Sequence, residues 1–433
     1  MYDTISNSIK RYAVQFVEQT LRRTLAPVRL VSRAGSEEQV LCDGGLAEHP
    51  DDRVTIYIND NKLWTRLLSD FDLGFAEAYM LQEVDCDNLS KVFDLYIQNP
   101  SALDPGTFLL QWVPRVTRWW RPENNIDNAR LHIASHYDTS NTLFSNFLSP
   151  DMNYSCAHWS ADSDETLEVA QRRKVHHLIK KARIEPGHHL LDIGCGWGDL
   201  IITAARDRGC KATGLTLSEE QKALADKRIK QAGLEGQIRV LLCDYREAPC
   251  PDNGYDQIIS VGMFEHVGPQ YMDQYFQTIT RLLKKDGGVM VIDGITKTGT
   301  FYKTNPLVGD YIDKYVFPGG YLPTPNILLE AMNRGSNSTL EVSSVINTGP
   351  HYGKTLLAWK DNFVQNWETI RRDFCDKHPG ADTADVEAYR RRWLYYFLYC
   401  EAGFRRRILG NYMICAVRVP EPVVMYDDLA CEW

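Results

Sequence analysis

Three glycines at alternate positions follow an acidic residue at the end of an apolar segment. Asp192 lies in that segment, and Gly194, Gly196 and Gly198 come next, before a second apolar stretch of helical character. Glycine adopts positive φ without strain and lets a ligand approach the backbone, and a helix start offers unpaired N–H groups. The spacing differs from the G-x-G-x-x-G of phosphate-binding turns. We therefore expect a turn that binds a nucleotide-type cofactor, the alternative being a tight turn without a ligand.

A carboxylate and an imidazole follow another apolar segment. Glu265 and His266 come shortly after the predicted strand 255–261. Ionisable groups at the carboxyl end of a strand, beside a cofactor turn, are candidates for proton transfer or charge stabilisation. A Glu-His pair on a loop is also common as a plain surface feature, but the position at a strand end favours function.

Polar residues also follow the second and third predicted strands. Ser218 with Gln221 three residues later has the pattern of a capping box. Thr216 and Gln221 could instead bind the ribose of the cofactor, and the two interpretations compete for Gln221. Asp244 lies where a contact to adenine is expected, and its structural alternative is a helix cap.

The elements that must position these residues alternate regularly. Such alternation predicts a parallel sheet covered by helices, with ligands at the carboxyl ends of the strands where the strand order reverses. Residues 297–335 read as a long insertion, which is typical of a functional lid. Strands are predicted at 189–194, 211–217, 238–243, 255–261, 289–295, 342–346 and 413–419, and helices at 168–182, 199–206, 218–232 and 270–284.

The N-terminal region has a different pattern. Residues 9–25 have the apolar spacing of an amphipathic helix, Val54–Ile58 alternates like a strand, and 63–68 and 73–80 are short helical candidates. A stretch rich in Arg, Trp and Pro at 115–129 indicates a boundary. We expect a smaller mixed α+β domain over 1–125 and a second domain over 126–433.

Composition excludes several classes of protein. The formal net charge of −9 argues against nucleic-acid binding. No apolar run reaches the length of a membrane span, and the N-terminus lacks the form of a signal peptide. The eleven cysteines include no C-x-x-C pair and the eleven histidines no spaced ligand set. We therefore expect reduced thiols, no metal site and a cytoplasmic location.

The glycine turn, D-I-G-C-G-W-G, resembles the first motif of S-adenosylmethionine (SAM) methyltransferases. Over nearly its whole length the chain resembles the cyclopropane fatty acid synthases, including the mycolic acid cyclopropane synthases. The N-terminal part resembles the family's accessory domain in Asp72–Tyr79 and Val84–Asp87. The other segments that carry the resemblance are His136–Asp138 with Asn141, Tyr154–Ala157, Leu191–Gly198, Gly214–Ser218 with Gln221, Met263–Gly268, Tyr311–Gly320, His351–Leu356 and Tyr399–Phe404.

The resemblance implies an α/β fold: a class I, Rossmann-like SAM-dependent methyltransferase domain with a lid insertion. It implies attack of a lipid alkene on the methyl group of SAM, a carbocation, and removal of a proton from the added methyl before the ring closes. Further cofactor contacts are expected at Tyr154, Ser155 and Val261. In the family a bicarbonate ion is the base, and the positions carried over for it are Cys156, Glu265, Tyr352 and the backbone of Ile295.

One position departs from the family pattern. Asp293 stands where the family has a histidine that helps to hold bicarbonate. A carboxylate beside Glu265 would repel an anion. Either one of the two acids is protonated, or bicarbonate is not bound as in the family; alternatively, Asp293 points away and bonds the lid.

Aromatic rings could shelter the cationic centre by cation–π attraction. The candidates are Phe264, Tyr315, Tyr352 and Trp159, and for Trp159 a core role is the better interpretation.

The leading functional hypothesis is cyclopropanation of an unsaturated phospholipid or another lipid acyl chain. Its rivals are C-methylation giving a branch, a catalytically silent lipid-binding protein, and a methyltransferase for a small natural product. Peripheral membrane contact is expected, with the helix at 9–25 as a candidate because Lys10, Arg11, Arg22 and Arg23 flank its apolar stripe. That stripe could equally pack on the catalytic domain. A homodimer is left open.

Overall fold

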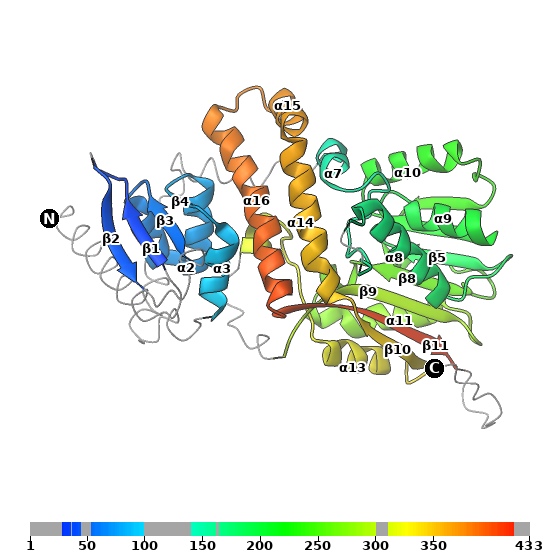
Figure 1. The fold of residues 1–433 in the computed structure, drawn as a ribbon. Coiled ribbons are helices and arrows are strands. Elements are labelled where there is room, and N and C mark those ends of the chain that lie inside the picture. The colour runs from blue at the N-terminus through cyan, green and yellow to red at the C-terminus, as the bar shows by residue number, and fades with distance from the viewer. Residues whose placement is uncertain are drawn as a thin grey trace. The chain divides into compact units, whose positions relative to one another are not determined.

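The computed structural model describes residues 28–35, 37–44, 53–98, 140–161, 164–299 and 311–419, and only the backbone of 68–72. The predicted helix at 9–25 and the predicted boundary at 115–129 lie outside these residues. The chain divides into two compact units (Figure 1). Among the described residues the first holds 28–98, 311–318 and 359–406, and the second holds the remainder.

The second unit is built on a seven-stranded sheet with the order β10-β11-β9-β8-β5-β6-β7. The strands β5 to β9 run parallel, and β11 lies antiparallel between β9 and β10. Because β6 lies on one side of β5 and β8 on the other, the strand order reverses at β5. The strands are β5 (His189–Ile193), β6 (Lys211–Thr216), β7 (Ile238–Leu242), β8 (Gln257–Val261), β9 (Val289–Lys297), β10 (Leu340–Asn347) and β11 (Leu409–Arg418).

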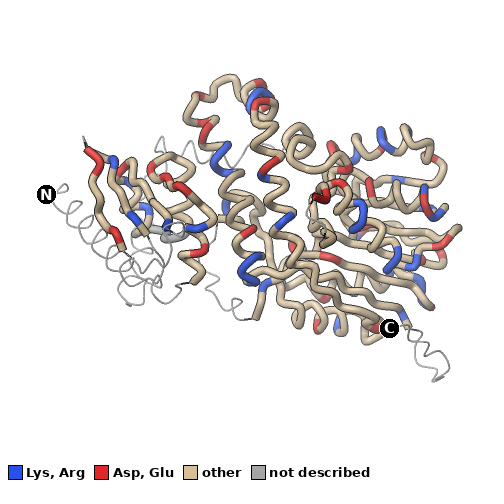
Figure 2. Tube along the Cα trace, viewed as in Figure 1, with Lys and Arg blue, Asp and Glu red and all other residues tan. Residues whose placement is uncertain are grey.

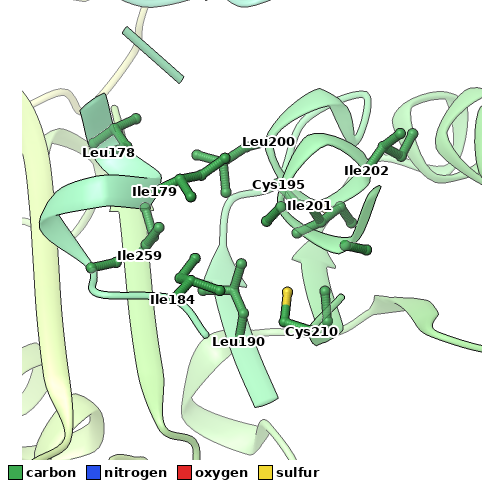
Figure 3. Close-up of a cluster of buried hydrophobic side chains, with 14 of the residues drawn as sticks. Leu178, Ile179, Ile184, Leu190, Cys195, Leu200, Ile201, Ile202, Cys210 and Ile259 are labelled. Carbon is green, nitrogen blue, oxygen red and sulfur yellow. The ribbon is translucent and has the colours of Figure 1, made fainter. Parts of the chain in front are cut away.

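Helices cover both faces of this sheet and bury two apolar clusters (Figure 1). One cluster lies under α8, α9 and α10 and contains Leu178, Leu190 and Ile201 (Figure 3). The other lies under α11 and α13 and contains Phe276, Ile292 and Leu328. The helices of this unit are α7 (Asn141–Phe147), α8 (Leu167–Lys181), α9 (Asp199–Arg208), α10 (Glu219–Gln231), α11 (Met272–Leu282) and α13 (Pro325–Gly335), with 3-10 turns at Tyr245–Glu247, Phe264–His266 and Pro269–Tyr271.

The first unit has a four-stranded sheet in the order β2-β1-β3-β4. A buried ionic cluster binds α12 to α2: Glu77 accepts hydrogen bonds from Lys314 Nζ at 2.7 Å and from the Tyr315 hydroxyl at 3.0 Å. The helix α14 (Gly349–Gln365) begins in the second unit and ends in the first. The first unit's elements are β1 (Val28–Ser32), β2 (Gln39–Gly44), β3 (Val54–Ile58), α2 (Lys62–Met80), β4 (Val84–Cys86), α3 (Leu89–Gln98), α12 (Tyr311–Tyr315), α15 (Trp367–Lys377) and α16 (Thr383–Arg405).

The predicted alternation of strands and helices is confirmed, with ends that differ by a few residues. One prediction was wrong: the two short helices expected at 63–68 and 73–80 are a single helix, α2. Backbone hydrogen bonds continue through the polar residues between these two segments, because no proline there removes a donor. Within the predicted insertion, the described part contains α12 and α13.

Acidic and basic positions are interspersed over the helices of the second unit (Figure 2). Among the described residues, no helix is both long and apolar enough to cross a bilayer.

Candidate active site

The glycine turn follows β5, at the point where the strand order reverses. Gly194, Gly196 and Gly198 have φ values of +86°, +53° and +84°, a region that other residues adopt only with strain. A Cβ atom built on Gly196 would meet no heavy atom within 4 Å. The space beside this glycine is therefore open to a ligand. Asp192, at the end of the strand, is buried, and burial raises its pKa to about 7.

The cysteine of this turn belongs to the core. Cys195 packs with Leu200 and Ile201 in the apolar cluster of Figure 3. A Cβ on Gly214 of the neighbouring strand β6 would lie 2.7 Å from Cys195 Sγ. The absence of a side chain at Gly214 therefore leaves room for Cys195, whose packing in the core fixes the turn.

The polar residues after β6 bond chiefly to one another. Ser218 Oγ accepts from the Gln221 N–H at 3.2 Å, which confirms the predicted cap of α10. The reciprocal half of the capping box is absent, because the Ser218 N–H donates to Thr216 Oγ1 at 3.1 Å. The Thr216 hydroxyl in turn donates to Gln221 Oε1 at 2.6 Å. Their ribose contacts stay predictions.

Asp244 forms a helix cap, which was the structural alternative to a contact with adenine. It caps the 3-10 turn Tyr245–Glu247 by accepting the Arg246 N–H at 2.9 Å, and it pairs with the Arg246 guanidinium at 2.7 Å. The hydrogen bonds from Arg246 lower the pKa of Asp244. Its contact to adenine stays a prediction.

Glu265 lies in the 3-10 turn after β8 and is buried. Its Oε1 accepts the Ile295 N–H at 2.7 Å, while Oε2 has no hydrogen-bond partner among the described residues. Burial is the main reason that its pKa rises to about 7, and the charge of Asp293 adds to it. A Cβ on Gly294 would lie 2.6 Å from the Phe264 ring and 2.7 Å from Glu265 Oε1. Gly294 is therefore what lets Glu265 approach β9.

Asp293 lies on β9 and is about 1% exposed. Its Oδ1 accepts from the Asn411 side-chain amide at 3.0 Å, and Oδ2 has no partner among the described residues. Burial raises the pKa of Asp293, whereas the Asn411 hydrogen bond and the charge of Lys174 lower it. Within the described part of the insertion nothing bonds this carboxyl group, which instead faces the polar residues of β11.

A chain of hydrogen bonds joins Asp293 to Cys156. Asn411 Nδ2 also donates to Thr348 Oγ1 at 2.8 Å, and Cys156 Sγ lies 3.4 Å from the Thr348 carbonyl oxygen. Burial, with the charge of Asp293, holds the pKa of the Cys156 thiol well above its ordinary value, so the thiol is neutral. Tyr352 is buried in the first turn of α14.

The remaining predicted residues have separate places. Tyr154 packs edge-on against Phe144, with ring centroids 5.1 Å apart, and Val261 is half-buried at the end of β8. Trp159 has the core role expected of it, because its indole N–H donates to Thr355 Oγ1 at 3.0 Å. Tyr315 belongs to the first unit, where its hydroxyl bonds Glu77.

Sequence reasoning missed Asn411, Thr348 and Lys174. The signal for Lys174 was available: Gln171 and Lys174 continue the helical stripe of Val175, Leu178, Ile179 and Ala182, so two polar residues lie on an apolar face. No comparable signal marks Asn411, since its importance comes from strand pairing across 118 residues of sequence.

Three of the residues at the family's bicarbonate positions, Cys156, Asp293 and Ile295, do not suit an anion. An anion needs hydrogen-bond donors. The Ile295 N–H already donates to Glu265, and the Cys156 sulfur lies beside backbone carbonyl oxygens. Asp293 contributes a carboxyl group where a histidine would donate. We derive no step through bicarbonate.

The family model described as mycolic acid cyclopropane synthetase matches residues 124–413. The tuberculostearic acid methyltransferase UfaA1 of Mycobacterium tuberculosis is 35% identical over 359 residues, covering 81% of this chain and 80% of its own length. The cyclopropane-fatty-acyl-phospholipid synthase of Escherichia coli K12 is 31% identical, covering 85% of this chain and 89% of its own length. The solved mycolic acid cyclopropane synthase CmaA1, in complex with SAH and CTAB, is 29% identical with a TM-score of 0.56, covering 69% of this chain and all of that one.

These matches agree with the open space beside the glycine turn and the parallel sheet on which it sits. SAM is the cofactor. The chain belongs to the mycolic acid cyclopropane synthetase family of SAM-dependent enzymes.

Proposed function

We propose that this enzyme adds a C1 unit to the double bond of an unsaturated lipid acyl chain and closes a cyclopropane ring. The observation that carries the proposal is a pair of buried acids, Glu265 in the turn after β8 and Asp293 on the neighbouring strand β9. Glu265 and Asp293 each keep one oxygen without a partner among the described residues. Buried carboxyl groups with raised pKa values suit proton removal near neutral pH.

The residues have separate tasks in this reaction. SAM would supply an electrophilic methyl group. The backbone of the turn at 194–198 would hold the cofactor. Attack by the alkene leaves a positive charge on the acyl chain, which the faces of Phe264 and Tyr352 could shelter by about 1–2 kcal/mol each when desolvated. Asp293 then accepts a proton through Oδ2, the oxygen that Asn411 does not occupy.

C-methylation is the second candidate, and the same carboxyl pair favours it. If the base reaches a proton on the neighbouring chain carbon instead of the added methyl, the product is a branch and not a ring. A base fixed to β9 has a more restricted reach than a small bound ion. The relative UfaA1 is named a tuberculostearic acid methyltransferase and not a cyclopropane synthase.

Expression in a host whose phospholipids contain unsaturated chains tests the proposal. Mass spectrometry should show acyl chains heavier by one methylene, and NMR separates ring from branch. The Asp293→Asn variant serves as the matched control. A lipid extract without any mass gain, together with tight lipid binding, would favour the silent lipid-binding protein; turnover of small alkenes but not of vesicles would favour a natural-product methyltransferase.

Membrane contact through residues 9–25 is a separate part of the proposal. These residues lie outside the described part of the chain, and the argument rests on the sequence pattern of basic residues beside an apolar stripe. A chain lacking residues 1–25 should sediment less with anionic vesicles than the full chain. Equal sedimentation of a folded truncated protein would contradict a membrane role for this segment.

A further inference from the structure

The helix α8 carries a buried lysine on its apolar face. Lys174 is about 1% exposed, and its Nζ donates to Asn153 Oδ1 at 2.9 Å and to Ser155 Oγ at 2.8 Å. Both acceptors are neutral, and among the described residues no carboxylate oxygen lies within 4.0 Å of Nζ. A buried cation without a direct ion pair costs folding free energy. Its retention needs a reason other than stability.

Lys174 acts together with Gln171, one helical turn earlier. The Gln171 side-chain amide donates to the Ser155 carbonyl oxygen at 2.8 Å and to that of Asn153 at 3.3 Å. Asn153 is held on its other side, because its amide donates to Asp199 Oδ2 at 2.9 Å. The two α8 side chains therefore fix the segment 153–155, which leads directly into Cys156 and the hydrogen-bond chain to Asp293.

The charge of Lys174 also reaches the acids of the site. It lowers the pKa of Asp293 and of Asp192, each of which burial raises. In return, Asp293 favours the charged lysine, although burial lowers the pKa of Lys174 overall. The titratable groups that interact electrostatically with this lysine or with Asp293 are Asp151, Cys156, His158, Asp192, Asp199, Glu265 and Cys415.

We propose that Lys174 is a positioning residue whose ammonium group fixes the segment 153–156 and places a positive charge in the buried site that contains Asp293. The catalytic half of this inference rests on the proposed function, because it assigns Asp293 as the base. The electrostatic half concerns the protein alone and can be measured without a lipid substrate.

The decisive variant is Lys174→Met, which keeps the length of the side chain and removes the charge. Because Asp293 loses the positive charge of Lys174, which lowers its pKa, the acidic limb of kcat/KM should move to higher pH. At acidic pH the loss should be about tenfold, and it should shrink as the pH rises. In an Asp293→Asn background, Lys174→Met should cause no further change in the pH profile of kcat/KM. Lys180→Met, an exposed lysine on the same helix, is the control and should change nothing.

A titration without substrate separates this inference from the proposed function. Infrared difference spectra between the wild type and Asp293→Asn identify the carboxyl band of Asp293. This band should titrate at higher pH in Lys174→Met, while Lys174→Arg, which keeps the charge, should restore the wild-type value if it folds. If the band moves but no lipid is modified, the proposed function fails and the electrostatic role stands.

Thermal unfolding guards against a merely structural effect. Lys174→Met removes a buried charge, but it also leaves Asn153 Oδ1 and Ser155 Oγ without their donor, so the unfolding temperature should fall modestly while the protein stays folded. An unchanged infrared band and an unchanged pH limb in a folded Lys174→Met protein would overturn the proposal. A lower unfolding temperature without either pH effect would show that the lysine only supports the fold.

Discussion

The side-chain amide of Asn411 on β11 donates to Asp293 Oδ1 on β9 over 3.0 Å. The bond runs between antiparallel neighbours in which Asn411 faces Ile295, the residue whose N–H holds Glu265. One strand pairing therefore orients the carboxyl group of Asp293 and also supports the backbone that orients Glu265.

Removing this amide should weaken the base. In Asn411→Ala the pKa of Asp293 rises because a hydrogen bond to its ionised form is lost, so the acidic limb of kcat/KM should move to higher pH. We also expect a loss of about 1.5–3 kcal/mol in the free energy of unfolding, measured in urea. The pH effect should disappear in an Asp293→Asn background; if it persists there, another group is responsible.

Asp293→Asn should lower the rate of C1 transfer by about 10²–10⁴-fold, the usual contribution of a general base. The change keeps the size of the side chain, so calorimetry should show unchanged SAM affinity. The wild type should need no added bicarbonate, whereas Asp293→His could acquire that requirement. Full activity of Asp293→Asn, with a wild type that depends strictly on bicarbonate, would show that the ion is still the base.

Gly294→Ala should disable the site by overpacking. The new methyl group would lie 2.6 Å from the Phe264 ring and 2.7 Å from Glu265 Oε1, so both side chains must move. We expect the free energy of unfolding to fall by about 1–3 kcal/mol. The loss of activity should be larger than the increase in the unfolded fraction can explain. Gly299→Ala is the control, since its Cβ would meet nothing within 4 Å. Normal activity of Gly294→Ala would remove Glu265 from the mechanism.

Gly196→Ala should abolish SAM binding while the fold survives. Its Cβ points into open space, so the substitution costs only the strain of a positive φ, about 1–2 kcal/mol. Gly187→Ala is a close control, because Gly187 also has positive φ and an open Cβ position but precedes β5. Calorimetry that finds equal SAM affinity in both variants would contradict the placement of the cofactor at this turn.

The stability of the protein should depend on the ionisation of Glu265. Its pKa is raised from 4.5 to about 7 in the folded state, so the folded protein binds the proton more tightly than the unfolded chain. This contribution is complete below about pH 4.5 and is lost as the pH rises to about 7. Glu265→Gln cannot ionise, so relative to the wild type it should gain about 1–3 kcal/mol between pH 5 and pH 8 in urea unfolding. A constant difference between the two proteins would contradict a buried, titrating Glu265.

The sequence was sufficient to predict the seven strands of the second unit, the glycine turn and the carboxyl group after β8, because these depend on local periodicity and on one strand end, but it did not predict β1, β2 and β4 of the first unit. It wrongly predicted a break within α2, which is one continuous helix through its polar residues. It could not predict that Asn411 would meet Asp293, since no local pattern encodes pairing between distant strands. Thr348 likewise matters only through the carbonyl and hydroxyl that the fold brings to Cys156 and Asn411.

Position 293 shows both the strength and the limit of resemblance. Comparison with the family pattern singled out Asp293 as unusual, but only the structure shows that Oδ1 is hydrogen-bonded and that Oδ2 has no partner among the described residues. The sequence also left open whether Ser218 and Gln221 form a capping box or Gln221 binds the ribose. The structure shows only the Ser218 half of the capping box, in which Ser218 Oγ accepts from the Gln221 N–H, while Thr216 bonds the other two residues.

The packing of Cys195 against Gly214 has a consequence for the supply of folded enzyme. Because the cofactor turn is anchored in the core by this cysteine, the turn cannot open without disturbing the cluster beneath it. If SAM binds at this turn as predicted, its binding is coupled to the unfolding equilibrium of the whole unit, and a SAM concentration of 100 times Kd would add about 2.7 kcal/mol to the free energy of unfolding. A cell short of SAM would lose molecules of this enzyme to proteolysis as well as the rate of those that remain.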